Sequence, residues 1–264
     1  MGGHLMADKF TKPLSGLRAL VIGIANDRSI AYGCARAFRR EGAELAITYL
    51  NDKARPFVEP LARELEAPIF LPLNVQQEGQ LEAVFEEIRR TWGRLDIALH
   101  SIAFAPKDDL QGGLLDCSLA GFLTAIDVSC HSFIRMARHA VPLMTQGGTL
   151  LALTFQGSTE VVPNYNVMGP VKAALESVVR YLAAELGPRG IRVHAISPGP
   201  VSTRASSGLK EFDQLLEDSR ARSPLGELVE IDDVGAGAAF LASPGARRMT
   251  GTILHVDAGL NITG

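Results

Sequence analysis

The residues of this sequence that could do chemistry together lie in one short stretch, FQGSTEVVPNYNVMGPVK, at 155–172. Tyr165 supplies a phenol, Lys172 follows it by seven residues, and Phe155 precedes it by ten. Unperturbed tyrosine and lysine titrate near pH 10 and about 10.4, so both side chains are protonated at neutral pH. Seven helical residues are close to two turns, which would place phenol and ammonium on one face, about 10 Å apart along the axis.

The alternative is that the tyrosine packs at a helix end and the lysine is solvated. Pro170 lies between them and has no backbone N–H, so it fits only the first turn of a helix. The elements around the pair must therefore decide between the two interpretations.

Length and composition are those of a single globular α/β domain. The chain has 264 residues, of which 47% are hydrophobic and 21% charged, enough to bury a large core without splitting into domains. Its 26 basic and 29 acidic residues give a net charge of −3, and no long basic run occurs. This balance argues against nucleic acid or an anionic membrane as a partner.

Targeting and redox signals point to the cytoplasm. The first ten residues lack the apolar core of a signal peptide, and no apolar run reaches the roughly 18 residues of a membrane span. Cys34, Cys117 and Cys130 are odd in number and far apart, unlike the cysteines of a zinc site or a disulfide scaffold. We therefore expect reduced thiols, no metal site and a cytoplasmic protein.

Seven short runs rich in Val, Ile and Leu alternate with longer amphipathic stretches, which is typical of β-α-β units around a parallel sheet. The expected strands are residues 17–23, 44–50, 68–74, 95–101, 148–154, 191–197 and 252–258. Helical spacing or capping residues mark helices at 29–42, 78–93 and 230–244. The prediction is one Rossmann-like domain at residues 12–262, a doubly wound parallel sheet with helices on both faces. Ligands bind such sheets beyond the carboxyl ends of the strands.

One long connection interrupts this alternation. About thirty residues, 197–227, separate the sixth strand from the next helix. Connections this long are usually binding loops or lids, and this one follows the carboxyl end of a strand. We expect a substrate lid at about 201–225; the alternative is a surface excursion of variable length.

The turn after the first strand, GIANDRSIAYGCA, offers a dinucleotide site. Gly23 at the strand end would let the backbone approach a diphosphate, and a helix start supplies free amides and a positive dipole. Ser29 can cap that helix or face phosphate oxygens. Gly23 and Gly33 do not have the spacing of the G-x-G-x-x-G fingerprint, so a simple tight turn is the alternative.

The end of the second strand leaves the choice between NADH and NADPH open. An acidic residue there favours NADH, and a basic one accommodates a 2′-phosphate. Leu50 offers no hydrogen bond, and it is followed by Asp52 as well as by Lys53 and Arg55.

Five segments in order resemble bacterial enoyl-acyl carrier protein reductases, the divergent branch of the short-chain dehydrogenase/reductase family. They are GIANDRSIAYGCA, EGAELAITYLND, LDIALHSIAFAP, the stretch from VPNYNVMG to VSTRASSG, and TGTILHVDAG. Common short-chain enzymes carry Tyr-x-x-x-Lys with a serine about thirteen residues upstream, whereas Gly169 and Ala152 occupy those positions here. The enoyl reductase branch has six residues between tyrosine and lysine, as this chain does.

The resemblance implies reduction of the trans-2 double bond of an enoyl-acyl carrier protein thioester in fatty acid synthesis. The hydride donor would be NADH, with NADPH as the alternative, and the enzyme a homotetramer. Lys172 would bind the nicotinamide ribose hydroxyls. Tyr165 would donate to the thioester carbonyl, whose oxygen gathers negative charge as the enolate develops.

Other site residues follow from the resemblance by position. The cofactor would meet Gly23, Ser29 and Ile30 in the diphosphate turn, Leu50, Asn74 and Val75 near the adenosine, Ile102 after the fourth strand, and Val201, Ser202, Thr203, Arg204 and Ala205 over the nicotinamide and diphosphate. Thr203 would donate to phosphate, and Ala105 would belong to the substrate site. Asn74 stands where the family has Asp, and it keeps an acceptor. Leu50 stands where NADH-preferring members often have Gln, so a polar contact is lost.

Phe155 is the departure with most consequence. Reductases of this type usually have a second tyrosine there, which lines the substrate pocket. Phenylalanine keeps the ring and loses a hydroxyl worth about one hydrogen bond. We therefore expect activity to survive with altered affinity for substrate. A carbonyl reductase or alcohol dehydrogenase on the same fold, and a non-catalytic dinucleotide-binding protein, are the alternatives.

Overall fold

Strands and helices alternate along the chain, as the apolar runs predict. The computed structural model describes residues 12–201 and 212–263. The strands are β1 (Arg18–Ile22), β2 (Glu44–Tyr49), β3 (Ile69–Pro72), β4 (Ile97–His100), β5 (Gly148–Leu153), β6 (Ile191–Pro198) and β7 (Ile253–Val256). The α-helices are α1 (Ile30–Arg40), α2 (Arg55–Glu64), α3 (Gln80–Trp92), α4 (Lys107–Gln111), α5 (Leu119–Ile126), α6 (Ser132–Ala140), α7 (Met168–Leu186), α8 (Phe212–Arg222) and α9 (Ile231–Ala242).

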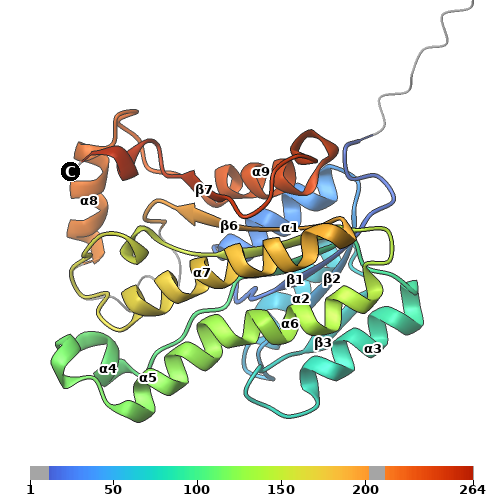
Figure 1. The fold of residues 1–264 in the computed structure, drawn as a ribbon, viewed down its shortest axis with the longest axis horizontal. Helices are drawn as coiled ribbons and strands as arrows, with labels where there is room; N and C mark the ends of the chain where they lie inside the picture. Colours follow the sequence, from blue (N-terminus) through green and yellow to red (C-terminus); the bar gives the residue numbers. More distant parts are fainter. Residues whose placement is uncertain (1–11, 202–211, 264) are drawn as a thin grey trace, which may run out of the picture.

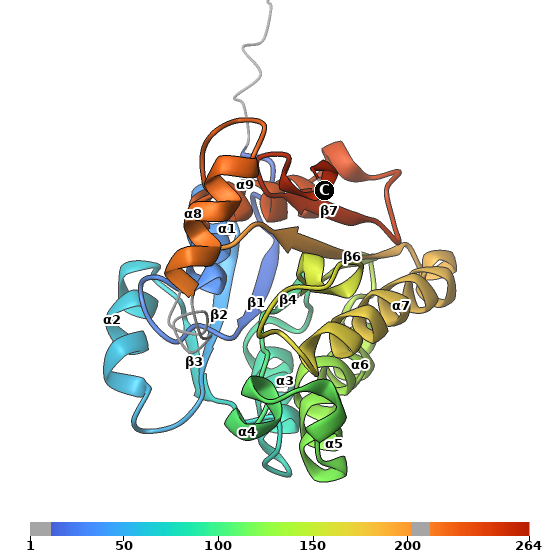
Figure 2. The ribbon, with the colours of Figure 1, turned by 90° about the vertical axis from the view of Figure 1, so that its left-hand side faces the viewer.

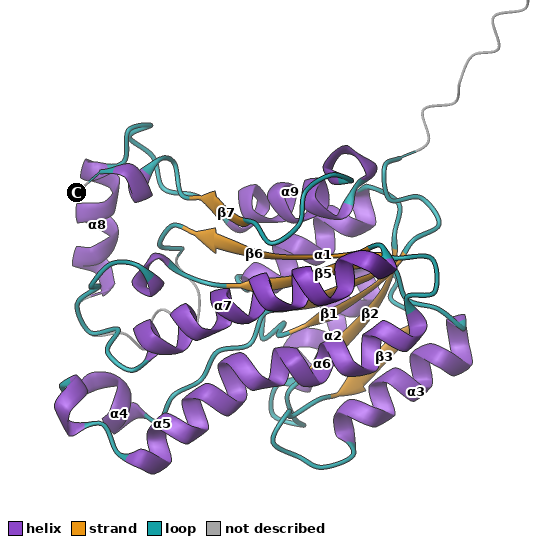
Figure 3. Ribbon diagram, viewed as in Figure 1, coloured by secondary structure: helices purple, strands orange, loops and turns teal. Residues whose placement is uncertain are grey.

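In the described part of the chain, the strands form one seven-stranded sheet in the order β3-β2-β1-β4-β5-β6-β7. Every neighbouring pair is parallel, so the predicted doubly wound sheet is confirmed. The chain leaves β1 in one direction for β2 and β3 and later returns to place β4 on its other side. Ligands bind at such a switch point, beyond the carboxyl ends of the strands. In Figures 1 and 3 this end faces left, toward α4 and α8.

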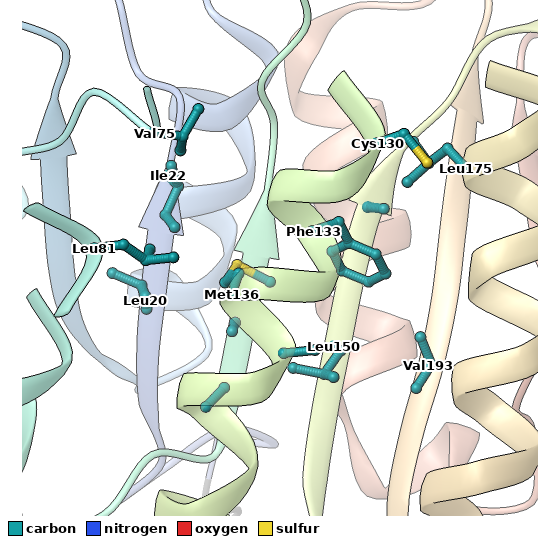
Figure 4. Close-up of a cluster of buried hydrophobic side chains, with 14 of the residues drawn as sticks. Leu20, Ile22, Val75, Leu81, Cys130, Phe133, Met136, Leu150, Leu175 and Val193 are labelled. Carbon is teal, nitrogen blue, oxygen red and sulfur yellow. The ribbon is translucent and has the colours of Figure 1, made fainter. Parts of the chain in front are cut away.

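Helices cover both faces of the sheet (Figures 1 and 2). Leu20 and Ile22 of β1 pack with α3, α6 and α7, whereas Ala19 and Val21 pack with α1, α2 and α9, because successive side chains of a strand point to opposite faces. Figure 4 shows the first of these clusters, in which Phe133 of α6 lies over the sheet. Among the helices that the structure describes, none is long and apolar enough to cross a membrane.

Two glycines bring α1 and α9 into backbone contact. A Cβ on Gly33 would lie 2.2 Å from the carbonyl oxygen of Ile231, and one on Gly235 would lie 2.4 Å from that of Gly33. The start of α9 is fixed by a capping box in which Glu230 and Asp233 bind each other's backbone amides, as the predicted capped helix requires. The close packing against α9 fixes the position of α1, the helix that follows the turn after β1.

The long connection after β6 contains a helix, α8, in its second half. The hydroxyl of Ser223 donates to the carbonyl of Ala258 at 2.8 Å, and Arg222 donates to that of Thr263 at 2.6 Å. The second half of the predicted lid is therefore anchored to the C-terminal segment. Residues 202–211, its first half, lie outside the described residues, and a lid function stays a prediction.

Candidate active site

Lys172 lies in the first turns of α7, behind the carboxyl end of β5. Its side chain is only 4% exposed, and Nζ donates to the carbonyl oxygen of Leu153 at 2.7 Å. Burial lowers the pKa of Lys172 to about 8, although the neighbouring Cys130 and Glu176 favour the charged form. A solvated surface lysine is therefore excluded, and at neutral pH the site holds a buried ammonium.

Glu176 follows Lys172 by one helical turn and is buried as well. Its carboxylate accepts the hydroxyl hydrogen of Thr154 at 2.7 Å. Thr154, the residue after Leu153, is thus hydrogen-bonded to α7 on the helix face that also carries Lys172. Our sequence predictions did not include Glu176 or Thr154, although four-residue spacing after Lys172 was a usable signal.

Tyr165 does not lie on a helix. α7 begins at Met168, and the residues before it form turns. Asn164 and Asn166, on either side of the tyrosine, have φ values of +61° and +37°, in the left-handed region that helices of L-residues do not use. The prediction of phenol and ammonium on one helical face is therefore wrong. Pro170 lies in the first turn of α7, where its missing N–H is tolerated.

The ring of Tyr165 is held by the segment that follows β5. It meets the ring of Phe155 edge to face, with centroids 5.0 Å apart and an interplanar angle of 62°. A Cβ on Gly157 would lie 2.5 Å from Cδ1 of Tyr165, so the ring rests directly on this glycine. Burial raises the pKa of Tyr165 above its usual value. The phenol consequently keeps its proton over the whole neutral range.

Gly23 makes a close backbone contact at the end of β1, with the segment after β4, and its predicted contact with a diphosphate stays a prediction. Its φ is +112°, and a Cβ there would lie 2.0 Å from the carbonyl oxygen of Ser101. Since Ser101 follows β4, this contact lies at the switch point between β1 and β4. Only glycine combines that φ with that separation.

Ser29 precedes α1, which begins at Ile30, but its side chain does not cap the helix. Its Oγ instead accepts the amides of Ala25 and Asn26, each at 3.0 Å, so Ser29 occupies the N-cap position without the side-chain bond that was one of its two predicted roles. The hydroxyl hydrogen has only a 3.4 Å contact with Oδ1 of Asn26, which is long for an O–H donor. This hydrogen and the first amides of α1 suit a phosphate group.

The residues predicted at the adenosine end follow β2 and β3. Leu50 is 54% exposed, whereas Val75 is buried and packs near Ile22 in the core (Figure 4). Oδ1 of Asn74 accepts the amide of Gln76 at 3.0 Å and so shapes its own turn. One lone pair of that oxygen is left for a ligand, while the side chain of Val75 is committed to the core.

The basic residues after β2 do not act alike. Arg55 bonds Glu59 at 3.2 Å, and its guanidinium lies over the ring of Tyr49 at 5.9 Å from the centroid. Asp52 and Lys53 are exposed. The guanidinium of Arg55 is thus already bound by residues of this protein and is not free to bind a phosphate.

The segment after β4 carries Ile102 and Ala105. Ile102 packs against the core and Ala105 is buried. Between them, the amide of Phe104 donates to Oγ of Ser129 at 2.9 Å, and that hydroxyl donates to the carbonyl of Phe104 at 3.1 Å. Ser129 lies in a π-helical turn, Asp127–His131, between α5 and α6. The sequence carried no signal for this tertiary bond.

A cleft of about 620 Å³ opens beside the diphosphate turn. Its lining includes Arg28 from that turn, Pro200 and Val201 after β6, and Arg220 and Ile231 from α8 and α9. Val201 therefore lies near the diphosphate turn, and its contact with a cofactor stays a prediction. Ser202, Thr203, Arg204 and Ala205, the other residues predicted for this loop, lie outside the described residues.

The carboxyl end of the sheet therefore combines a buried cation, a phenol held in its protonated form and a glycine turn at a helix start. A positioned phenol can stabilise negative charge that develops on an oxygen. The cation and the turn suit the hydroxyls and phosphates of a dinucleotide. These features suit a reductase site on a dinucleotide-binding fold.

Comparison with known proteins indicates the family of this chain. Residues 23–261 match the family described as enoyl-(acyl carrier protein) reductase. The chain is 48% identical over 254 residues to the enoyl-acyl-carrier-protein reductase (NADH) FabI of Nostoc sp., covering 95% of this chain and 98% of that protein.

Solved structures agree over a similar span. The enoyl-acyl-carrier-protein reductase of Anaplasma phagocytophilum, solved in complex with NAD, is 44% identical with a TM-score of 0.92, over 95% of this chain and 96% of that one. The Bacillus cereus enoyl-acyl carrier protein reductase with NADP+ and indole naphthyridinone is 43% identical with a TM-score of 0.93, over 96% and 99%. Because sequence and fold both agree over nearly the full length of each relative, the chain belongs to the enoyl-acyl carrier protein reductase family.

Proposed function

We propose that this protein reduces the trans-2 double bond of an enoyl thioester carried by acyl carrier protein, as a step of fatty acid synthesis. The observation that carries the proposal is the pairing of a buried Lys172, bonded to Leu153 at the end of β5, with a Tyr165 phenol whose pKa burial raises. Both occur in a chain of the enoyl reductase family, with that family's spacing between them.

The two residues have separate tasks. When bound, NADH supplies the hydride that adds to the β-carbon of the substrate. The phenol of Tyr165 donates a hydrogen bond to the thioester carbonyl and stabilises the charge that gathers on its oxygen. Lys172 holds the nicotinamide ribose hydroxyls, since its ammonium has three donors and Leu153 accepts only one. The buried setting strengthens both interactions by excluding water.

The remaining contacts follow the same division. Gly23, Ser29 and the amides at Ile30 hold the diphosphate; Leu50, Asn74 and the backbone at Val75 border the adenosine; Ile102 and the loop from Val201 through Thr203 to Ala205 border the nicotinamide half. Ala105 and Phe155 line the substrate site. We propose the segment at 201–225 as the substrate lid.

We propose NADH as the preferred cofactor. Arg55, the residue after β2 best suited to a 2′-phosphate, is engaged by Glu59 and Tyr49, and the exposed Asp52 suits a free ribose hydroxyl. A larger kcat/KM with NADPH than with NADH would contradict this choice.

We also propose a homotetramer that works in the cytoplasm. Leu119 and Leu123 on α5 and Tyr181 on α7 are exposed apolar or aromatic side chains, which is typical of subunit contacts. The three free thiols suit a reducing compartment. Light scattering coupled to size exclusion tests the assembly, and cell fractionation tests the location.

The decisive experiment measures NADH oxidation with crotonyl thioester and, separately, with acetoacetyl thioester. We expect turnover with the first only. Tyr165→Phe should lower kcat by about 10²- to 10³-fold with little change in NADH affinity, because it removes one oxyanion donor. Turnover with acetoacetyl thioester alone would identify a carbonyl reductase, and turnover with neither would indicate a nucleotide-binding protein.

A further inference from the structure

Asn166, the residue after Tyr165, makes an unusual pair of bonds. Its Nδ2 donates to the carbonyl of Leu110 at 2.7 Å and to the carbonyl of Gly112. An amide nitrogen has two hydrogens, so one side chain serves both acceptors. These carbonyls lie at the C-terminal end of α4, where helical carbonyls lack partners within the helix.

The backbone of Asn166 is adapted to this contact. Its φ of +37° is left-handed, a conformation in which asparagine is favoured over most other residues. Since Asn164 is left-handed as well, the turn that carries Tyr165 takes its shape from the two asparagines beside it. The amide of Asn166 then attaches this turn to a segment more than fifty residues earlier in the chain.

The segment that receives these bonds is itself firmly held. Asp109 of α4 is buried and accepts the amide of Ser118 at 2.7 Å. At the other end of the segment, Phe104 is bound through both backbone groups by Ser129. We call residues 104–118 the frame, because both of its ends are held by hydrogen bonds. Asn166 therefore joins the tyrosine turn to a segment that is itself fixed in place.

This frame borders the substrate site of the proposed function, because Ala105 lies between Phe104 and α4. On its other side, the Tyr165 ring rests on Phe155 and Gly157. The tyrosine is consequently held by its ring from β5 and by its following residue from α4. Of these two attachments, the second depends on a single side chain.

We propose that Asn166 is a positioning residue, whose two amide bonds set the phenol of Tyr165 relative to the wall of the substrate site. It acts through Tyr165 and touches neither substrate nor cofactor. The inference rests on the proposed enoyl reduction. A small displacement of a catalytic group can cost about a hundredfold in rate, so loss of the two Asn166 hydrogen bonds should lower kcat measurably.

Two variants test the two hydrogen bonds of Asn166. Asn166→Asp keeps the size of the side chain but replaces both donors by acceptors, and Asn166→Gly keeps the left-handed backbone but removes the side chain. With crotonyl thioester and NADH, we expect each to lower kcat by about ten- to a hundredfold. The dissociation constant for NADH should change less than about twofold, because Lys172 and the diphosphate turn are untouched. Val161→Ala, at a fully exposed position of the segment before the tyrosine turn, is the control and should keep kcat near that of the wild type.

A double mutant separates positioning from general damage to the fold. In a Tyr165→Phe background, Asn166→Gly should cause almost no further loss of kcat, because the group that it positions is already gone. An additive loss would overturn the proposal, as would an unchanged kcat in Asn166→Gly or an equal loss in Val161→Ala. An inactive wild type would overturn the proposed function and with it this inference, whereas an active wild type with an unaffected Asn166→Gly would overturn the inference alone.

Discussion

The rings of Phe155 and Tyr165 meet edge to face, with centroids 5.0 Å apart and planes inclined at 62°. Aromatic pairs with this geometry stabilise each other by about 0.5–1.5 kcal/mol beyond the area that they bury. The phenylalanine that replaces a second pocket tyrosine thus supports the ring of the proposed proton donor. This contact needs a ring at position 155 and does not need a hydroxyl.

Phe155→Tyr should therefore change activity little. The ring contact with Tyr165 survives, and the added hydroxyl contributes at most one hydrogen bond of about 0.5–1.5 kcal/mol. We expect kcat/KM with crotonyl thioester to change by about two- to tenfold. A gain of several thousandfold would mean that the natural chain is not a competent enoyl reductase.

Gly157→Ala should disturb Tyr165 directly. The new Cβ would lie 2.5 Å from Cδ1 and 2.8 Å from Cε1 of that ring, so the ring must move. We expect kcat to fall by at least about tenfold while NADH binding is retained. The matched control is Gly187→Ala, whose Cβ would meet nothing within 4 Å, and which should keep full activity. Equal kcat values for the two variants would contradict the role of Gly157.

Lys172 should impose an alkaline limit on cofactor use. Burial lowers its pKa to about 8, and kcat/KM reports the ionisation of the free enzyme. We expect kcat/KM for NADH to fall as pH rises through about 8, because the ammonium is lost. In Lys172→Arg the cation persists, so a limb that stays near pH 8 in this variant would belong to another group.

The same residue should affect stability in the opposite direction. An unfolded lysine titrates near 10.5, above the native value of about 8 for Lys172. Between these values the unfolded chain binds one more proton than the native chain, so this residue makes the free energy of unfolding rise with pH. Below pH 8 both states hold the proton, and the contribution no longer varies. Urea unfolding at pH 8 and pH 10 should show a smaller rise in Lys172→Met than in the wild type.

His100 should make the protein sensitive to acid. Its Nε2 lies 2.6 Å from Oγ of Ser132 in the core, and burial, together with the charges of Lys172 and Arg135, lowers its pKa from 6.5 to about 3. Between those values the unfolded chain binds one more proton, so stability falls as pH falls.

Urea unfolding at pH 7 and pH 4.5 measures this effect. His100→Gln should lose less stability between the two than the wild type does. The loss should not vanish, since burial also lowers the pKa of His194, to about 4. The exposed His131 provides the control: if His131→Gln weakens the acid response as much as His100→Gln does, the core histidine is not its cause.

The fold was predictable from the sequence because its signals are local. Parallel strands covered on both faces must be apolar along their whole length, so the seven runs predicted the seven strands to within a few residues. A glycine at a strand end indicated a close backbone approach at Gly23, but its observed partner, Ser101, was not predicted. The spacing of Tyr165 and Lys172 indicated the family only together with the other matching segments around it.

The local shape around the tyrosine was not accessible in this way. The spacing allowed a helix that includes Tyr165, yet the left-handed backbone at Asn164 and Asn166 prevents a helix there, and α7 begins only at Met168. Ser29 had the chemistry of a cap, yet it accepts amides from the preceding turn. In both cases a propensity was outweighed by contacts that a one-dimensional pattern does not contain.

The sequence by itself determined the order of strands and helices, the identity of the phenol and the ammonium, and the family to which they belong. Only the tertiary structure decided that the ammonium is buried against Leu153 and that the phenol is held by Gly157 and Phe155. It also revealed that Asn166 reaches Leu110. The reason is physical: a pKa and a side-chain position depend on neighbours that folding brings from distant parts of the chain, and spacing along the chain does not record them.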